Sequence, residues 1–166
     1  GANENGFGPS PRAVQAMRDA APDVWKYADP TSHDLRHALA AHHAIAADSI
    51  VVGEGIDGLL GYLVRLFVQS GDAVVTSDGA YPTFNYHVQG FGGTLHKVPY
   101  RNDAEDLPAL LDLARQVDAK LVYFANPNNP MGTYARGADI VAQLDRIRQG
   151  CLLVLDEAYV EFAPAD

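Results

Sequence analysis

Short hydrophobic runs alternate with segments of helical periodicity through most of the chain. The hydrophobic runs fit four strands, at residues 73–77, 94–99, 120–125 and 151–156. The segments between and beside them fit three helices, at residues 81–90, 107–116 and 137–148. Runs such as KLVYFA and CLLVLD are almost continuously apolar, as is typical of strands that are covered on both faces. The alternation predicts an α/β fold, with a mainly parallel sheet and helices on both faces.

The beginning of the chain has a different pattern. Residues 1–11 (GANENGFGPSP) have the glycine, proline and asparagine density of an ordered loop. A short helix is predicted at residues 12–20, with Ser10 as its N-cap and Pro11 at its first helical position.

Ser32 is expected to cap a second helix, in which Leu35, Leu39 and His42 or His43 lie on one face. A short strand is predicted at residues 49–53, followed by an apolar helix at residues 58–69. No internal repeat or low-complexity tract interrupts this order.

Length, charge and composition exclude some classes of partner. The chain has 166 residues, of which 48% are hydrophobic, and a net charge of −9 from 12 basic and 21 acidic side chains. This length corresponds to about one domain, at roughly 100–200 residues per domain. No basic run is available to grip a phosphate backbone, so we expect no nucleic-acid partner. No apolar stretch reaches the roughly 20 residues of a membrane-spanning helix, so we expect no membrane partner.

Two further expectations concern the chain ends and the single cysteine. The sequence begins with Gly1 rather than Met and stops at Asp166, just after a dense motif, so we expect a piece of a longer protein. Cys151 is the only cysteine and cannot form an internal disulfide, which fits a reducing, cytoplasmic location. It begins a predicted buried strand, where we expect it to be inert.

The segments after the predicted strands carry the residues of chemical interest. In an open parallel sheet, ligands bind beyond the carboxyl ends of the strands, which lie at one edge. Four such segments are rich in Gly, Asn, Asp or Tyr, at residues 53–58, 77–81, 126–132 and 156–159.

The glycine-rich segment GEGIDG, at residues 53–58, follows a predicted strand and opens a helix. Small residues there let backbone amides approach a phosphate. The segment matches G-x-G-x-x-G, and Asp78 lies 20 residues after Gly58, where a dinucleotide site has its ribose-binding acid. About 48 residues of loop and helix precede the strand before this segment, whereas the first strand of a dinucleotide fold usually comes early. A simple glycine turn is the other interpretation, and a triphosphate-binding loop is excluded because no Gly-Lys-Ser/Thr follows.

The segment NPNNPMG, at residues 126–132, has two Asn-Pro steps. An asparagine before proline is held in an extended conformation, so two such steps make a stiff loop that projects its amides. We interpret it as a ligand-binding loop, with a surface turn as the alternative.

The segment LLVLDEAY places Asp156 at the end of a buried strand. A carboxylate there is costly unless it has a cationic partner or a metal. The missing triphosphate loop removes magnesium as the partner. Two interpretations are left: a protonated ring nitrogen, with the Tyr159 hydroxyl on a second atom of the same ring, or local backbone amides.

The segment GAYPTFNYH carries three aromatic side chains, Tyr81, Phe84 and Tyr86. They provide either a flat face for a planar cofactor or part of the core. Several histidines also gather on one predicted helix: His33, His37, His42 and His43. We expect an amphipathic surface helix rather than a metal site.

Together these segments resemble a fold-type I, pyridoxal-phosphate-dependent aminotransferase, most closely the histidinol-phosphate aminotransferase family, over essentially the whole chain. NENGFGPSP is similar to that family's N-terminal arm, with Gly6 in place of its usual proline. WKYADP is similar to its tyrosine-bearing turn, GEGIDG to its phosphate-binding loop and SDGAYPTF to its stacking-aromatic segment. NPNNPMG and LDEAY, with 27 residues from Asn129 to Asp156, resemble two cofactor-binding segments. Met131 replaces the usual threonine.

The resemblance implies the incomplete large domain of a fold-type I enzyme. Residues 1–31 then form the N-terminal arm and the start of the small-domain region. Residues 32–166 form the N-terminal part of the large domain that binds pyridoxal 5'-phosphate.

It also implies roles for the residues around the cofactor ring. Asp156 pairs with the protonated pyridine nitrogen, and Asn129 and Tyr159 hydrogen-bond the phenolic oxygen. Tyr81 stacks on the ring.

At the other end of the cofactor, the backbone amides of Ile56, Asp57 and Gly58 bind the phosphate. Tyr27 resembles a tyrosine that reaches the phosphate of the neighbouring subunit's cofactor. The resemblance therefore implies a homodimer with shared active sites.

No catalytic residue is expected within this chain. Its lysines are Lys26, Lys97 and Lys120, and none lies in a serine-rich turn after LDEAY, where the family has its Schiff-base lysine. That lysine and the substrate-binding arginines are expected beyond Asp166, so the piece alone is expected to be inactive.

The implied function of the full-length enzyme is transamination of an amino donor such as histidinol phosphate with 2-oxoglutarate, in histidine biosynthesis. Its partners are an amino-acid or amino-phosphate substrate and a 2-oxo acid. Three alternatives are open: another aminotransferase or a phospho-amino-acid lyase with the same cofactor, a dinucleotide-binding oxidoreductase, and a non-catalytic aminotransferase-like binding domain.

Overall fold

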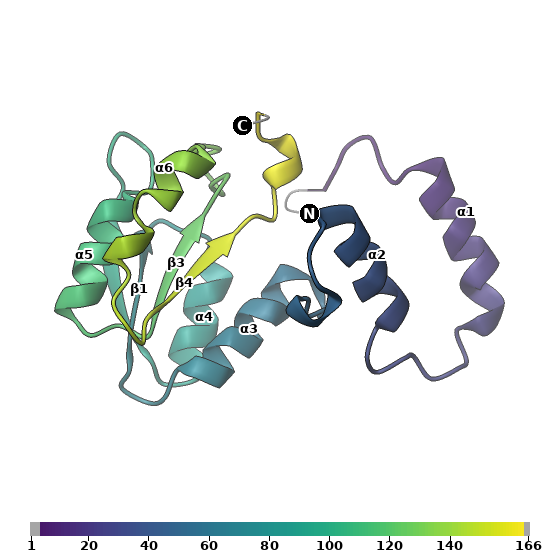
Figure 1. Cartoon of the computed structure of the whole chain (residues 1–166), viewed down its shortest axis with the longest axis horizontal. Coiled ribbons are helices and arrows are strands. Elements are labelled where there is room, and N and C mark those ends of the chain that lie inside the picture. Colours follow the sequence, from purple (N-terminus) through teal and green to yellow (C-terminus); the bar gives the residue numbers. More distant parts are fainter. Residues whose placement is uncertain (1–3, 165–166) are drawn as a thin grey trace. The chain divides into compact units, whose positions relative to one another are not determined.

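The structure is a computed structural model that describes residues 4–164. Residues 1–3 of the predicted N-terminal loop and residues 165–166 at the end of the predicted large domain lie outside the described residues. The chain divides into two compact units, Gly1–Val52 and Gly53–Asp166 (Figure 1). The functional boundary expected between residues 31 and 32 stays a prediction.

The first unit contains two helices and two short 3-10 turns: α1 Pro11–Ala20, η1 Ala21–Asp23, α2 His33–His43 and η2 Ala47–Ser49. The predicted start of α1 is confirmed. The Ser10 side chain accepts a hydrogen bond from the Ala13 amide at 3.1 Å, and Pro11 occupies the first helical position, where its missing N–H has no consequence.

The prediction that Ser32 caps α2 is wrong. Ser32 has a left-handed backbone (φ 47°), and its side chain makes no capping hydrogen bond. Asp29 satisfies this end of the helix instead, because its Oδ2 accepts from the His33 amide at 2.8 Å and its Oδ1 from the Thr31 amide at 2.9 Å. These hydrogen bonds, with that from His33 the largest cause, hold the pKa of Asp29 below its usual value.

The strand predicted at residues 49–53 does not form. Ile50 has an extended backbone (φ −114°, ψ 126°), but in the described part of the chain no strand pairs with residues 50–53. A hydrophobic run becomes a strand only when a neighbour completes its ladder of hydrogen bonds. The helix that follows, α3 Gly55–Phe67, begins three residues before its predicted start and includes the last four residues of GEGIDG.

The second unit is a parallel sheet with the strand order β2-β1-β3-β4, which confirms the predicted fold class. Its strands are β1 Ala73–Asp78, β2 Thr94–Pro99, β3 Leu121–Ala125 and β4 Leu152–Asp156. Besides α3, its helical segments are α4 Pro82–Gly90, α5 Leu107–Gln116, α6 Gly137–Val141, η3 Leu144–Arg146 and η4 Val160–Phe162.

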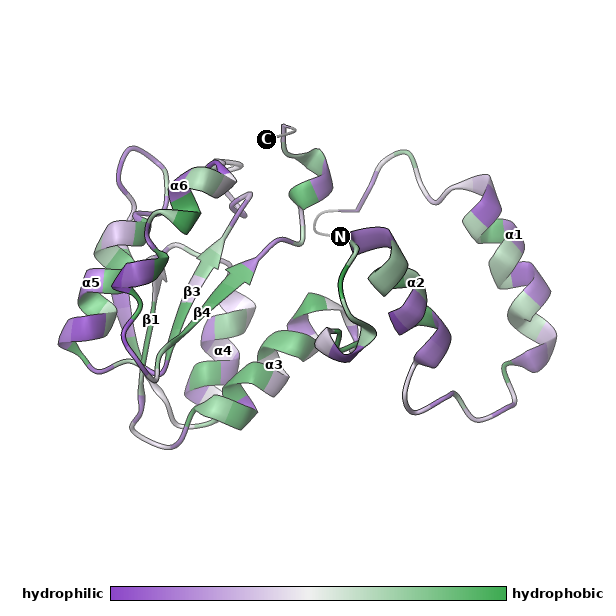
Figure 2. Ribbon diagram, viewed as in Figure 1, coloured by the Kyte–Doolittle hydropathy of each residue, from purple (hydrophilic) through white to green (hydrophobic). Residues whose placement is uncertain are grey.

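Helices cover both faces of this sheet, as predicted. Neighbouring strand residues point to opposite faces, so Val74 packs with α3 and α4 whereas Val75 packs with α5 and α6. Both sides of β3 are buried, which explains its uninterrupted hydrophobic sequence. Figure 2 shows the hydrophobic strands between the helices, with hydrophilic positions on α5, whereas α3 is hydrophobic over most of its visible surface.

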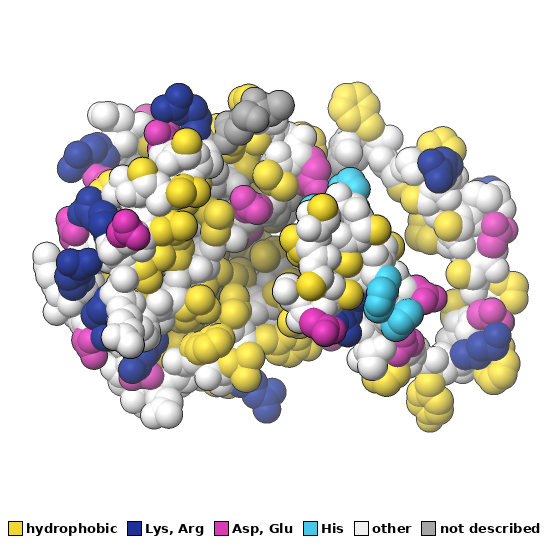
Figure 3. Space-filling view, in the orientation of Figure 1, with side chains coloured by type: hydrophobic (Ala, Val, Ile, Leu, Met, Phe, Trp, Pro, Cys, Tyr) yellow, Lys and Arg dark blue, Asp and Glu magenta, His cyan; other side chains and the backbone are white. Residues whose placement is uncertain are grey.

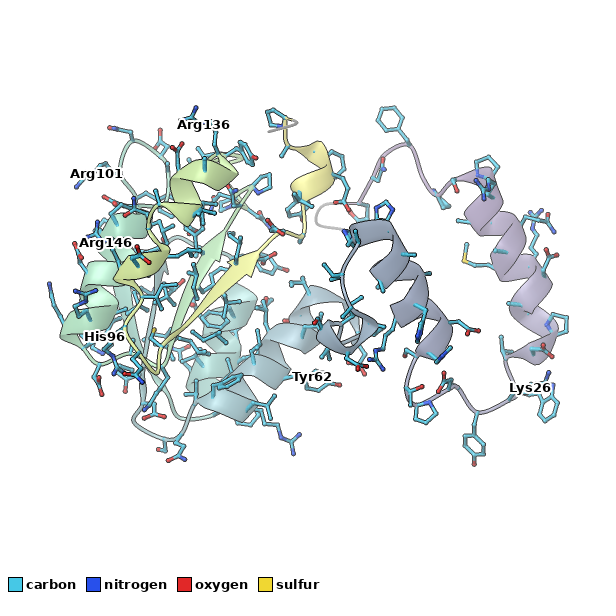
Figure 4. All side chains as sticks on the ribbon, in the orientation of Figure 1. Lys26, Tyr62, His96, Arg101, Arg136 and Arg146 are labelled. Carbon is cyan, nitrogen blue, oxygen red and sulfur yellow. The ribbon has the colours of Figure 1, made fainter. Side chains whose placement is uncertain are left out.

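The helix predicted at residues 137–148 is broken into α6 and η3. Arg146 of η3 forms an ion pair with Asp112 of α5, and its carbonyl accepts a hydrogen bond from Arg115 at 2.8 Å (Figure 4). These contacts hold residues 144–147 against α5 in a tighter turn than a continuous helix has.

The strand order also fixes where a ligand is expected. From β1 the chain crosses through α4 to β2 on one side, and then returns through α5 to β3 on the other side. The reversal leaves a crevice at the carboxyl ends of β1 and β3, where open α/β sheets bind ligands.

Gly93 tests the packing between α3, α4 and β2. A Cβ at this position would lie 2.8 Å from Val68 Cγ1 and 2.9 Å from Val88 Cγ1. We expect Gly93→Ala to lower the free energy of unfolding by about 1–3 kcal/mol, because the buried valines must shift. Gly90→Ala is the matched control, since nothing lies within 4 Å of its added Cβ. Urea denaturation of both variants measures the difference, and equal stabilities would contradict this packing.

Candidate functional site

The carboxyl edge of the sheet brings five of the eight predicted cofactor-binding residues to one hollow of about 70 Å³. These five are Ile56, Tyr81, Asn129, Asp156 and Tyr159. The remaining wall is made by Tyr123, Ala125, Pro127 and Ala158. Each of the four segments singled out in the sequence contributes at least one of these residues, as expected if they meet at this edge.

Asp156 provides the carboxylate of the hollow and is buried, with 7% of its surface exposed. Tyr123 donates a hydrogen bond to its Oδ2 at 2.5 Å, and the Ala158 amide donates to its Oδ1 at 3.0 Å. Among residues 4–164, no Lys, Arg or His side chain forms an ion pair with it. The carboxylate is therefore held by one local amide and one phenol, and its charge is not balanced by a cation of the described chain.

Tyr123 was not predicted as a site residue, because it lies inside a run that signals only a buried strand. Its side chain is fully buried and stacks on Phe84, with ring centroids 4.7 Å apart. Burial, together with the hydrogen bond to Asp156, raises the pKa of Tyr123 above its usual value. The phenol therefore stays protonated and acts as a donor to the carboxylate.

The three aromatic residues of GAYPTFNYH have three different environments. Phe84 belongs to the core, and Tyr86 is exposed on the surface of α4. Tyr81, immediately before α4, lines the hollow. Of the three, the structure thus brings only Tyr81 to the place that a stacking ring needs.

The glycine-rich segment forms the N-terminal turn of α3. Gly55 has a positive φ of 70°, a conformation that favours glycine, and lets the chain turn sharply into the helix. The N-cap residue Glu54 makes no side-chain capping hydrogen bond to the first turn. The amides of Ile56, Asp57 and Gly58 are thus available at the positive end of the helix, beside a hollow that Ile56 lines.

The NPNNPMG loop uses two of its asparagines for its own structure. The Asn126 amide group exchanges two hydrogen bonds with the backbone of Ala135, both at 2.8 Å. Asn128 Oδ1 accepts from the Met131 amide at 3.0 Å. Both Asn-Pro peptide bonds are cis. Of the three asparagines, only Asn129 lines the hollow, so the expectation that the loop projects its amides holds for one side chain.

Glu105 supports this loop from behind and was also not predicted. Its Oε1 accepts a hydrogen bond from Asn128 Nδ2 at 2.7 Å, and its Oε2 accepts from the Ala125 amide at 3.4 Å. Burial raises the pKa of Glu105 to about 7. The stretch NDAED around it has the composition of an exposed loop, so no sequence pattern indicates a half-buried carboxyl there.

Three other predicted residues lie outside the hollow. Tyr27 is in the first unit and is fully exposed. Asp57 and Gly58 contribute through their backbone in the first turn of α3, and the Asp57 side chain contacts His87. Asp78, the acid of the dinucleotide alternative, forms a surface ion pair with Lys97 at 3.2 Å.

A larger hollow, of about 860 Å³, lies beside β4 and contains none of the predicted site residues. It is formed by α6, η3, β4 and η4, and hydrophobic side chains gather over this face (Figure 3). Among them, Val141, Leu144 and Leu152 are 40–64% exposed. We place the site at the smaller hollow because polar groups of defined geometry converge there.

Two further findings concern metals and membranes. Within residues 4–164, no group of three or more His, Cys, Asp or Glu side chains is placed to hold a metal ion. His33 and His37 contact each other on α2, with ring centroids 4.0 Å apart. In the same part of the chain, no helix has both the length and the apolar character needed to cross a membrane.

The fold is an open α/β sheet of the doubly wound type, with a hollow at the carboxyl edge of its strands. The chain belongs to the aminotransferase class I and II family, which it matches over residues 1–166. The predicted resemblance to this class is confirmed.

Individual relatives are similar over nearly the whole chain. A crystal structure of histidinol-phosphate aminotransferase from Sinorhizobium meliloti in complex with pyridoxal-5'-phosphate is 56% identical, with a TM-score of 0.97, and the match covers 99% of this chain and 45% of that one. Histidinol-phosphate aminotransferases from Moorella thermoacetica and Anaeromyxobacter sp. are 36% and 39% identical, over 99% and 98% of this chain. The chain spans 42% and 45% of their lengths.

Cystalysin from Treponema denticola, which contains a pyridoxal 5'-phosphate cofactor, is 19% identical with a TM-score of 0.75. The match covers 90% of this chain and 41% of cystalysin. At this identity it supports the fold alone.

The raised pKa of Glu105 predicts how stability depends on pH. A carboxyl with a pKa of about 7 in the folded protein and 4.5 as its ordinary value binds its proton more tightly when folded. Its contribution to the free energy of unfolding is then largest below pH 4.5, falls as the pH rises, and is lost above pH 7. We expect Glu105→Gln to remove this slope, whereas Glu161→Gln, at an exposed carboxyl, keeps it. Urea denaturation of the full-length protein between pH 5 and 8 measures both, and an unchanged slope in Glu105→Gln would contradict this assignment.

Proposed function

We propose that this chain forms the cofactor-binding part of a pyridoxal-phosphate-dependent aminotransferase. The full-length enzyme transfers the amino group of histidinol phosphate, or a closely related amino donor, to 2-oxoglutarate. The observation that carries the proposal is the buried Asp156 carboxylate, which lacks a cationic partner among residues 4–164 and lies in the same hollow as Tyr81, Asn129 and Tyr159.

The donors and acceptors of the hollow fit this cofactor. Asp156 offers an acceptor to a protonated pyridine nitrogen, and such a cation would supply the charge balance that the described chain lacks. When bound, the cofactor supplies a cationic ring that takes up the electrons released at the substrate's Cα–H bond. Asp156 holds the proton on the ring nitrogen, and Tyr123 and the Ala158 amide hold the carboxylate in place.

Asn129 and Tyr159 follow β3 and β4 and approach the hollow from the same edge. In the proposed complex their side chains hydrogen-bond the phenolic oxygen of the ring. Tyr81 stacks on the ring face. These three roles rest on the resemblance together with the shared hollow.

The phosphate is proposed to bind at the amides of Ile56, Asp57 and Gly58. Support comes from the uncapped first turn of α3 and from Ile56, which places that turn beside the ring site. A helix N-terminus with unsatisfied amides favours an anion.

The rest of the proposed enzyme lies outside the hollow. Lys26 and Lys97 form ion pairs with Asp23 and Asp78, and Lys120 directly precedes β3. None of these three lysines is among the residues that line the hollow. We infer that the cofactor-binding lysine and the substrate-binding arginines follow Asp166 in the full-length protein.

The proposed active protein is a cytoplasmic homodimer in which Tyr27 reaches the partner's cofactor phosphate. The full exposure of Tyr27 supports this role, because its side chain is free to meet another subunit. The proposed arm and small-domain region is residues 1–31, and the proposed cofactor domain begins at residue 32. The names of the relatives support histidinol phosphate as the donor.

Titration of the full-length protein tests the class of function. We expect pyridoxal 5'-phosphate to produce a visible absorption band, and we expect no fluorescence quenching with NADH, because Asp78 is engaged with Lys97. Comparison of kcat/KM among histidinol phosphate and other amino donors then tests the substrate. Tight NADH binding without pyridoxal-phosphate binding would favour the oxidoreductase alternative.

Asp156→Asn tests the proposed acid directly. Without the carboxylate the ring nitrogen is not held in its protonated form, so we expect kcat to fall by about 10²- to 10⁴-fold. Asp145→Asn, at an exposed carboxylate, is the matched control and should leave kcat unchanged. Steady-state kinetics of the two full-length variants measures the effect, and wild-type turnover in Asp156→Asn would remove Asp156 from the mechanism.

A further inference from the structure

The side chain of Asp57 makes a contact that its proposed backbone role does not require. His87 of α4 donates from Nε2 to Asp57 Oδ1 at 3.0 Å. The His87 side chain is 29% exposed and that of Asp57 is 59% exposed, so the pair lies at the rim of the α3–α4 interface.

The imidazole of His87 lies directly on α3. A Cβ added at Gly61 would be 3.0 Å from His87 Cε1 and 3.2 Å from its Nδ1, so a side chain at this position would displace the ring. Gly61 is one helical turn after Asp57 and therefore lies on the same face of α3. The two residues together form a seat for His87.

This seat links two elements of the proposed site. Asp57 is in the first turn of α3, where its amide is one of the three proposed to bind phosphate. His87 belongs to the helix that begins directly after Tyr81, the proposed stacking residue. One hydrogen bond therefore connects the phosphate-binding turn with the helix that follows the ring-stacking residue.

The charge of Asp57 gives this link a further consequence. A carboxylate in the first helical turn is favoured by the helix dipole, but it repels a phosphate that binds at the same amides. Glu54, the other acid of GEGIDG, is also engaged, since Tyr62 Oη donates to its Oε2 at 3.0 Å (Figure 4). Of these two acids, Asp57 contacts a basic side chain, that of His87.

We propose that His87 is a positioning residue for the phosphate end of the site: its hydrogen bond holds the Asp57 carboxylate against α4, so that the first turn of α3 accepts a phosphomonoester. This inference rests on the proposed function.

Helix packing alone does not require the pair. The α3–α4 interface is already filled by the buried residues Leu60, Val64, Phe84 and Val88. A partly exposed ion pair at the rim adds little to stability. Its effect is therefore expected in the affinity for an anion more than in the unfolding of the protein.

The experiment uses the full-length protein and two ligands that differ only in the phosphate, pyridoxal 5'-phosphate and pyridoxal. In His87→Phe a ring still covers Gly61 but cannot donate to Asp57. We expect its dissociation constant for pyridoxal 5'-phosphate to rise about 3- to 10-fold, and that for pyridoxal to stay within about twofold of the wild-type value. In the double variant Asp57→Asn/His87→Phe the repelling carboxylate is also gone, and we expect the affinity for pyridoxal 5'-phosphate to recover.

His87→Gln is the matched control, because its amide can still donate to Asp57, and we expect a smaller loss than in His87→Phe. Equal weakening of both ligands in His87→Phe, or no recovery in the double variant, would make His87 a packing residue only and overturn the proposal. Wild-type protein that binds neither ligand would overturn the proposed function as well, so the wild-type arm separates the two failures. Thermal melts of the cofactor-free variants show whether any loss arises from unfolding.

Discussion

The arrangement of the site depends on how one buried carboxylate is held. Asp156 ends β4 in register with Ala125 of β3, so Tyr123, two residues earlier on the same face of β3, reaches its side chain. The backbone carbonyl of Asp156 accepts a hydrogen bond from the Asn126 amide at 2.8 Å, which fixes the start of the loop that carries Asn129. A single residue thus sets the position of a charge through its side chain and of a binding loop through its backbone. Burial of an ionised group is costly unless donors surround it, and this requirement explains why a tyrosine lies inside an otherwise apolar strand.

The same requirement is met differently at Glu105, a half-buried carboxyl near the same edge. Asp156 receives a phenol and one local amide, whereas Glu105 receives the Asn128 side-chain amide at 2.7 Å and a long contact from the Ala125 amide. Burial raises the pKa of Glu105 to about 7, and the nearby charge of Asp156 acts in the same direction. Glu105 has the weaker set of donors, so they offset less of the effect of burial on its pKa. The loop at residues 126–132 is held by the Glu105 carboxyl through Asn128 and by the Asp156 backbone carbonyl through the Asn126 amide.

The sequence predicted the parts of this molecule that depend on local pattern. The four parallel strands were found because short hydrophobic runs alternate with helical segments, and β3, which is buried on both faces, has the most continuous run. The Ser10 cap was found because its chemistry is local. The strand predicted at residues 49–53 was wrong, because a strand needs a partner to complete its hydrogen bonds. The single helix predicted at residues 137–148 was also wrong, because contacts with α5 hold η3 in a tight turn. Of the site, the residues after each strand were predicted from the geometry of parallel sheets. Tyr123, Glu105 and the contact of Asp57 with His87 were missed, since each pairs residues that are 20 or more positions apart.

The donors of Asp156 also link ligand binding to the stability of the sheet. In the described part of the chain, β4 pairs with β3 alone, so the β3–β4 ladder and the Tyr123 hydrogen bond place this carboxylate from one side. Neither donor carries a positive charge, so the desolvation of the carboxylate is only partly offset within residues 4–164. A cationic group that binds in the hollow offsets it further, and any ligand that binds only the folded state stabilises that state. The residue that defines the proposed chemistry is therefore also the residue through which the cofactor would stabilise the end of the sheet.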